Sequence, residues 1–170
     1  GKYGLIIIDA DSKSLKNVFK VYMKSEIINN NCHDQVNIQI ETLKKEYNSK
    51  FKPQVNPRLI NLFYLNKGGR YRIEKKKNQF VLIGSNKKFS ENDLINEIEN
   101  FPENFSPNVL MRPLYQEVIL PNIAYVGGGA ELSYWLQLNK YFKNQKVTFP
   151  ILVLRNSLLL INLKLSNKLN

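Results

Sequence analysis

Three consecutive glycines, Gly127, Gly128 and Gly129, stand where a polypeptide can bind an anion. They follow the apolar stretch 123–126 and precede a segment whose bulky residues recur at helical spacing. At the start of a helix, unpaired N–H groups and the helix dipole attract a phosphate or a carboxylate. The spacing is neither GxGxxG nor that of a P-loop, and a tight strand-to-helix turn with positive φ explains the glycines equally well. We therefore predict a nucleotide- or anion-binding corner, with the tight turn as the alternative.

Two arginines are the main candidates for binding an acidic substrate, because a guanidinium pairs bidentately with a carboxylate. Arg112 lies in a segment with helical spacing, and Arg155 directly follows an apolar, strand-like run. The structural alternative for Arg112 is an ion pair with Glu117. Further substrate contacts are predicted from one more arginine and three amide side chains: Arg58, Asn61, Gln116 and Asn156.

Three carboxylates are candidate catalytic residues: Asp9, Asp11 and Glu117. A carboxylate can hold a substrate ammonium or, as a general base, take the proton of an attacking amine. The alternatives are structural. Asp9 and Asp11 then act as helix caps, and Gln116 and Glu117 form an exposed helical face.

The chain has one cysteine, Cys32, and one histidine, His33. A single cysteine excludes an internal disulfide and a multi-cysteine zinc site, and it fits a reducing cytosol. We predict no metal site and no catalytic role for either residue.

The elements that position these residues begin with a strand and two helices. The apolar run 5–8 is typical of a strand buried on both faces of a parallel sheet. Asp11 or Ser12 then caps a helix whose apolar side is formed by Leu15, Val18, Phe19, Tyr22 and Met23. A second amphipathic helix, predicted to end near Lys52 and Pro53, carries Val36, Ile40, Leu43 and Tyr47.

The middle of the chain changes to the period of strands. Segments 59–65, 70–76 and 79–83 are joined by connections too short for parallel crossovers, which predicts an antiparallel meander. Ser90 and Asp93 are placed as the capping box of a following helix. Ser106 and Pro107 are predicted to start another helix that ends before Pro121.

The last third returns to a strand, the glycine corner, a helix around Trp135, and a final strand in "FPILVLRNS". This order predicts an α/β fold with an inserted antiparallel meander and helix subdomain. Three core strands are few for a doubly wound sheet, so part of the sheet is expected to lie outside this segment.

Size and charge narrow the class of protein. A chain of 170 residues with 43% hydrophobic residues fits one globular domain with a real core. We find no apolar run of membrane-span length and no signal peptide, so a cytoplasmic location is expected. The net charge of +11 raises a nucleic-acid-binding module as an alternative. Its densest basic patch, within residues 67–88, is interpreted mainly as a solvated face.

Four motifs occur together in an informative order: "GLIIIDAD", "KPQVNPRLINLFYL", "FSPNVLMRPLYQEVILPNIAYVGGGAELSYWLQL" and "FPILVLRNS". Over essentially its whole length the chain resembles the middle part of the bacillithiol biosynthesis cysteine-adding enzymes, also called cysteine ligases. The resemblance implies a Rossmann-like core in 1–50 and 106–157, with a connecting subdomain inserted at 51–105. It also implies that 158–170 begin a coiled-coil helix that leads into a dimerisation element.

The resemblance implies a ligase that joins the carboxyl group of cysteine to the amine of glucosaminyl malate, the last step of bacillithiol assembly. A free carboxylate must be activated first, which makes ATP or another nucleotide a candidate cofactor. Cysteine and glucosaminyl malate are then the substrates, a homodimer is expected, and nucleic acid and membranes are not expected partners. Family motifs expected before residue 1 are missing here, so a largely architectural, inactive segment is the remaining alternative.

Overall fold

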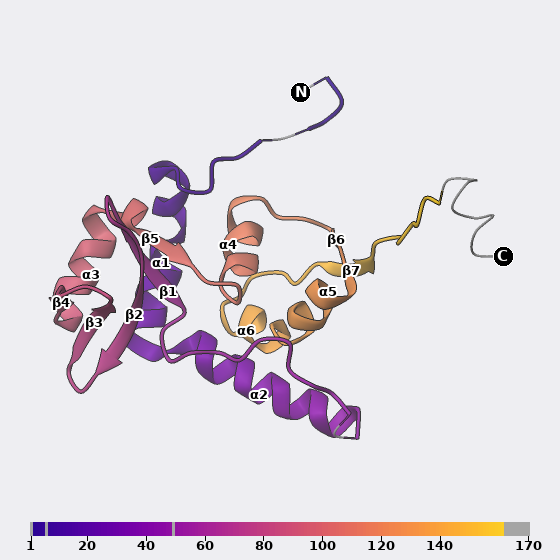
Figure 1. Ribbon diagram of the computed structural model, residues 1–170, viewed down its shortest axis with the longest axis horizontal. Coiled ribbons are helices and arrows are strands. Elements are labelled where there is room, and N and C mark those ends of the chain that lie inside the picture. The colour runs from indigo at the N-terminus through magenta and orange to yellow at the C-terminus, as the bar shows by residue number, and fades with distance from the viewer. Residues whose placement is uncertain (1, 6, 49, 162–170) are drawn as a thin grey trace.

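The computed structural model describes residues 2–5, 7–48 and 50–161. Its largest sheet has five antiparallel strands in the order β4-β3-β2-β1-β5 (Figure 1). The strands are β1 (Leu62–Asn66), β2 (Gly69–Lys76), β3 (Gln79–Ile83), β4 (Lys88–Phe89) and β5 (Phe105–Pro107). The predicted meander is therefore confirmed, and it gains two short strands.

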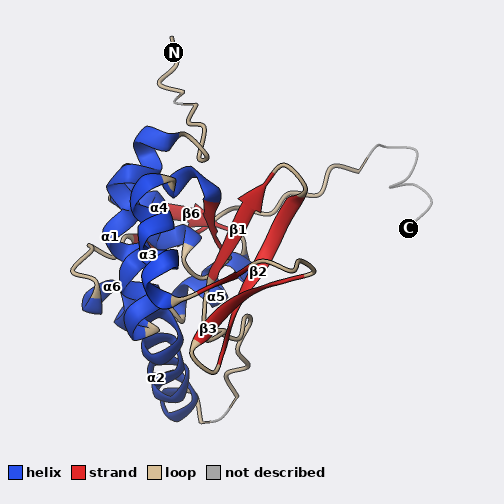
Figure 2. Cartoon of the chain, turned by 90° about the vertical axis from the view of Figure 1, so that its left-hand side faces the viewer, coloured by secondary structure: helices blue, strands red, loops and turns tan. Residues whose placement is uncertain are grey.

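The meander forms because its strands alternate in polarity. In β1 to β3 the side chains of Leu62, Tyr64, Ile73, Phe80 and Leu82 are buried, while their neighbours along each strand are more exposed. Such alternation is typical of an antiparallel sheet with one face on the core and one toward water. Figure 2 shows helices gathered on one side of this sheet.

Two long helices begin the described fold, α1 (Lys13–Asn29) and α2 (Asn31–Glu46). Asn30 joins them in the left-handed conformation, with φ of 51°, which asparagine tolerates better than most residues. Phe19 and Met23 of α1 are buried as predicted, whereas Val18 is 56% exposed. The second helix ends at Glu46, earlier than predicted, and the chain then runs in turns and loops toward β1.

The next helical segments are α3 (Glu91–Asn100), the 3-10 turn η1 (Pro102–Asn104) and α4 (Arg112–Ile119). The predicted capping box of α3 is present, since Asp93 N–H donates to Ser90 Oγ at 3.1 Å and Ser90 N–H donates to Asp93 Oδ2 at 3.2 Å. A helix start at Ser106 and Pro107 is wrong, because these residues belong to β5 and pair with β1. Instead Asn108 Oδ1 accepts the N–H groups of Leu110 and Met111, so α4 begins later.

A parallel unit completes the fold: β6 (Ala124–Gly127), α5 (Gly129–Leu136), α6 (Asn139–Asn144) and β7 (Ile151–Leu154). Strands β6 and β7 pair in parallel, with Val126 opposite Val153. Figure 1 shows this unit at one end of the molecule and the meander with α3 at the other, with α1 between them and α2 below. One apolar cluster runs through both ends and includes Phe19, Phe80, Leu114, Trp135 and Phe142.

Two predicted elements differ from the structure. The described residues of the run 5–8, Leu5, Ile7 and Ile8, form no strand and are exposed. The parallel sheet therefore has two strands among the described residues, not three. Residues 158–161 are in no helix, and the rest of the expected coiled-coil start, 162–170, lies outside the described residues. The expected domain boundaries stay predictions.

Within the described ranges, no helix is both long enough and apolar enough to cross a bilayer.

Candidate functional site

The glycine corner joins β6 to α5. Leu132 N–H donates to Gly128 O at 2.9 Å, so the first turn of α5 closes directly on the corner. Gly128 has φ of −72° and ψ of 165°, and none of the three glycines has a positive φ. The positive-φ explanation for these glycines is therefore wrong.

Close packing explains Gly127 instead. A Cβ atom there would lie 2.7 Å from Tyr125 Cε1, and the Tyr125 ring stacks on Trp135 with centroids 4.3 Å apart. A Cβ atom on Gly129 would meet nothing within 4 Å. Sterically, the corner requires glycine at its first position and leaves its third position open.

Glu131 occupies the start of α5. Its Oε2 accepts the Gly128 N–H at 3.0 Å, and its Oε1 accepts the Tyr125 hydroxyl at 3.0 Å. The Gly128 N–H lowers the pKa of Glu131 most, and Tyr125, Arg155 and Arg112 lower it further. Glu131 is thus an anion at neutral pH, with two arginines in its surroundings.

Both predicted arginines lie close enough to this carboxylate to lower its pKa. Arg155 N–H donates to Gly127 O at 2.9 Å, which continues the parallel pairing and places the side chain over the corner. A Cβ atom on Gly128 would lie 3.3 Å from Arg155 Nη2. The fold therefore unites Arg155 with the glycines, as the sequence predicted.

Arg112 approaches from α4. Its Nη2 donates to the Tyr134 hydroxyl at 3.3 Å, and its Nη1 donates to Gln116 Oε1 at 3.2 Å. Burial alone lowers the pKa of Arg112, but Tyr134 and Tyr125 outweigh it, so the net shift is upward and the group stays cationic. The ion pair with Glu117 does not form; Gln116 is the partner.

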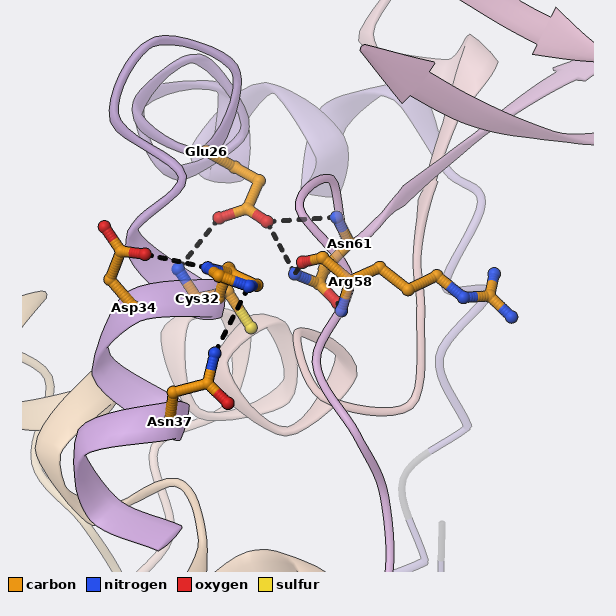
Figure 3. Close-up of polar contacts among 7 residues, drawn as sticks. Glu26, Cys32, Asp34, Asn37, Arg58 and Asn61 are labelled. Atoms are coloured by element: carbon orange, nitrogen blue, oxygen red, sulfur yellow. Dashed lines mark hydrogen bonds and ion pairs between the residues drawn. The ribbon is translucent and has the colours of Figure 1, made fainter. Parts of the chain in front are cut away.

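The structure places Asn61 elsewhere, in a buried polar cluster (Figure 3). Its side chain is 1% exposed, and its Nδ2 donates to Glu26 Oε1 at 2.9 Å. The same Glu26 carboxylate accepts the backbone N–H groups of Asn61 at 3.0 Å and Cys32 at 2.9 Å. The side chain of Arg58 points away from this cluster (Figure 3).

Glu117 is also buried and already paired, being 3% exposed. Its carboxylate accepts the Asn122 N–H at 2.9 Å and the Asn122 Nδ2 at 3.1 Å, which fixes the turn between α4 and β6. This is a buried structural position, unlike the exposed helical face considered for it. We therefore leave Glu117 and Asn61 out of the proposed site.

Asp9 and Asp11 lie before α1. Asp9 Oδ1 accepts the Asp11 N–H at 2.9 Å, and Asp11 Oδ1 is 3.1 Å from Lys16 Nζ. Ser12 takes the N-cap position of α1 without a side-chain capping bond. Asp11 borders a cavity that Arg112 also lines, whereas Asn156 is exposed beyond β7.

A nucleotide phosphate fits the corner poorly. The Gly128 N–H, which would be a first ligand for phosphate, is taken by the Glu131 carboxylate, and two anions at one helix start repel each other. Among the residues that the structure describes, no group of three or more His, Cys, Asp and Glu side chains could hold a metal ion.

The sequence interpretation did not select Tyr125 or Tyr134 as site residues, and it considered Glu131 only as a carboxylate that would compete with an incoming anion or hold a substrate ammonium. Glu131 had a detectable signal, because it stands three residues after Gly128, where a side chain can reach back to the helix start. The two tyrosines had no such signal, since an aromatic residue in an apolar strand or in an apolar helix is usually a packing residue.

Fold and site together define an α/β domain in which a parallel strand, a glycine corner and a helix lie beside two arginines, Arg112 and Arg155. The chain matches a family described as "Bacillithiol biosynthesis BshC, N-terminal Rossmann-like domain" over residues 1–156. It belongs to this family, and the Rossmann-like α/β class predicted from the sequence is confirmed. The predicted position in the middle of the full-length protein stays a prediction.

Relatives agree with this assignment. The chain is 47% identical over 164 residues to a protein of Flavobacterium psychrophilum named "Putative cysteine ligase BshC", covering 96% of this chain and 30% of that protein. A protein of the same name from Flavobacterium johnsoniae is 45% identical over 166 residues, covering 98% of this chain and 30% of that protein. One from Staphylococcus haemolyticus is 33% identical over 156 residues, covering 91% and 28%.

The chain thus spans about 30% of the length of the curated relatives it matches. These relatives do not favour the nucleic-acid-binding alternative.

Proposed function

We propose that the protein acts in the ligation of cysteine to glucosaminyl malate, with this domain supplying the corner that binds the acidic sugar substrate. The family and the names of its relatives support the reaction class. The single observation that carries the site assignment is the position of Arg155 against Gly128, with Arg112 bonded to Tyr134 and both arginines near Glu131.

In this proposal the arginines bind carboxylates. Arg112 lies in α4 and Arg155 directly follows β7, and both charges act on Glu131 at the start of α5. Guanidinium groups stay charged at any physiological pH and bind carboxylates with two parallel hydrogen bonds. A malate moiety offers two carboxylates, so each arginine has a partner.

Glu131 is assigned to the substrate amine. Its pKa is held low by the Gly128 N–H first, and by Tyr125 and the arginines as well, so it stays ionised and can orient an ammonium. A low pKa makes it a weak base. The base that takes the amine proton is therefore proposed among the predicted acids Asp9 and Asp11, of which Asp11 shares a cavity with Arg112.

Amide formation also requires activation of the cysteine carboxyl, because oxide is a poor leaving group. ATP or another nucleotide as the activating reagent stays a prediction. So do the cytoplasmic location and the homodimer through a coiled coil.

The test is steady-state kinetics of the full-length protein with cysteine and glucosaminyl malate. Arg155→Ala removes one charge-assisted contact and is expected to raise the KM for glucosaminyl malate by about tenfold or more, with little effect on the KM for cysteine. Lys143→Ala is the matched control, because it removes an exposed positive charge from α6 at the same end of the molecule. Equal KM values for Arg155→Ala and Lys143→Ala would exclude Arg155 from substrate binding.

A further inference from the structure

A basic cavity of about 360 Å³ lies at the start of α1, beside β5 and the start of α4. Its charged lining is Asp11, Lys16, Arg70 and Arg112, and Tyr115 forms part of its wall. None of the three corner glycines lines it. The cavity is within the usual size range of small-molecule sites.

Lys16 is the buried member of this lining, at 1% exposure. Its Nζ donates to Phe105 O, lies 3.1 Å from Asp11 Oδ1 and stands 5.6 Å from the centre of the Tyr115 ring. A lysine that is buried without being fully neutralised is uncommon, because the charged form loses its water. The fold therefore keeps the Lys16 ammonium at the cavity wall, although its burial costs hydration free energy.

Arg70 lies near the start of β2, the central strand of the five-stranded sheet. Its Nη2 donates to Pro107 O at 3.0 Å, and its guanidinium carbon lies 3.9 Å from the centre of the Phe63 ring. These contacts use the face and one nitrogen of the guanidinium. The remaining N–H groups stay available to an anion, because arginine has five donors.

The charges in the cavity are unbalanced. Three cations face one carboxylate, and Asp11 is 65% exposed to water. Burial is the main cause that lowers the pKa of Lys16; the charge of Arg70 lowers it further, and Asp11 opposes both. Like charges in one cavity attract an anion that relieves their repulsion.

An apolar extension adjoins the basic cavity. A second cavity of about 190 Å³ shares Ala10, Arg112 and Tyr115 with the first and is otherwise lined mainly by Ile8, Ile119 and Leu120. The shared residues make the two cavities neighbours. Together they offer a basic end and an apolar end.

We infer that this basic cavity is a binding site for a small organic anion, whose carboxylate or phosphate group contacts Lys16, Arg70 and Arg112 while its carbon part enters the apolar extension. None of the corner glycines lines the site, which shares Arg112 with the proposed substrate contacts and Asp11 with the proposed general bases. It goes beyond the proposed ligase function and does not rest on it.

Calorimetric titration of the full-length protein tests this site, with malate as the dicarboxylate probe and inorganic phosphate as the phosphate probe. Arg70→Gln is expected to weaken binding of the preferred probe by about tenfold or more. Lys67→Gln, an exposed charge on the same hairpin, is expected to leave it unchanged. The tighter of the two probes identifies the anionic group that the site prefers.

Two further variants separate this site from the corner. Lys16→Met keeps the apolar part of the side chain and is also expected to weaken binding, whereas Arg155→Ala is expected to leave in place the component of binding that depends on Arg70 and Lys16. The inference is overturned if neither probe binds, or if Arg70→Gln and Lys16→Met both bind like the unmodified protein. A loss of binding in Arg155→Ala alone would also overturn it, because the anion would then occupy the glycine corner.

Discussion

Glu26 and Glu131 both accept backbone N–H groups, but they lie in different surroundings. We call the buried cluster of Glu26, Cys32 and Asn61 the closed region, and the glycine corner with Glu131 the open region. Glu26 lies in α1 at 1% exposure, and its carboxylate accepts three N–H bonds from Cys32 and Asn61. Glu131 lies at the open start of α5, with one backbone N–H, one tyrosine hydroxyl and two arginines nearby.

The difference is visible in their pKa shifts. Burial raises the pKa of Glu26 above its usual value, although its hydrogen bonds act in the opposite direction. Hydrogen bonding to Gly128 lowers the pKa of Glu131. In the closed region, burial of the Glu26 carboxylate costs electrostatic free energy, but its hydrogen bonds connect α1, α2 and the segment that leads into β1. The open region combines one carboxylate with two arginines, whose charges partly compensate one another.

The largest expected loss of stability comes from removing the Glu26 carboxylate from the closed region. Glu26→Ala leaves three buried N–H groups without an acceptor, and each such group costs about 1 to 3 kcal/mol. We expect a loss of about 3 kcal/mol or more in the free energy of unfolding. Urea unfolding, followed by the fluorescence of the single tryptophan, Trp135, measures it.

The matched control for this change is Glu41→Ala on α2. Glu41 forms an exposed ion pair with Lys44 at 2.8 Å, and such pairs contribute at most about 1 kcal/mol. A similar loss in both variants would show that the buried cluster has no special role in stability.

A smaller effect is expected in the open region, at Gly127. The added methyl group of Gly127→Ala would lie 2.7 Å from Tyr125 Cε1, and stacking on Trp135 restrains that ring. Overpacking of this kind costs about 1 to 3 kcal/mol. Gly129→Ala has open space and is expected to be neutral or stabilising by up to about 1 kcal/mol. Equal unfolding free energies for the two variants would contradict the close-packing role of Gly127.

The smallest effect is the pH dependence of the two carboxylates. Because the folded pKa of Glu131 is lowered, its stabilising contribution is present above the unfolded value of 4.5 and is lost as the pH falls through the folded pKa. Glu26 has the opposite sign: its folded pKa is raised above 4.5, so its contribution worsens as the pH rises through the window between these values.

Carboxyl-carbon NMR titration checks these signs directly. Glu26 is expected to titrate above 4.5 and Glu131 below it. Glu131→Gln and Glu26→Gln assign the two signals by removing them. A reversed order would contradict the contrast between the closed and open regions.

Local sequence was enough to predict much of the fold. Strands predicted at 59–65, 70–76 and 79–83 from alternation and short turns are observed at 62–66, 69–76 and 79–83, and the capping box at Ser90 and Asp93 fixed the start of α3. The site residues stay predictions. Arg155 lies against the glycines because its N–H extends the parallel pairing to Gly127, and Arg112 contacts Gln116.

The spacing of charged residues in α1 could also have predicted buried polar contacts, but the sequence interpretation did not use it. Lys16 and Glu26 fall on the same face of α1 as Phe19 and Met23, at separations of three, four and three residues. A charged residue on an apolar helical face must find a partner when it is buried. The pattern predicts that partners exist, but it does not identify Phe105, Asp11, Cys32 or Asn61 as those partners.

The sequence by itself determined the periodic elements and the glycine-bearing strand-to-helix corner, because these depend on residues close along the chain. Only the tertiary structure decided that Asn61 and Glu117 are buried structural partners and that β5 joins the meander. It also decided that the described residues of 5–8 stay outside the sheet. Those outcomes depend on which distant groups share a desolvated space, and hydrogen bonding there is set by three-dimensional proximity and not by spacing in the sequence.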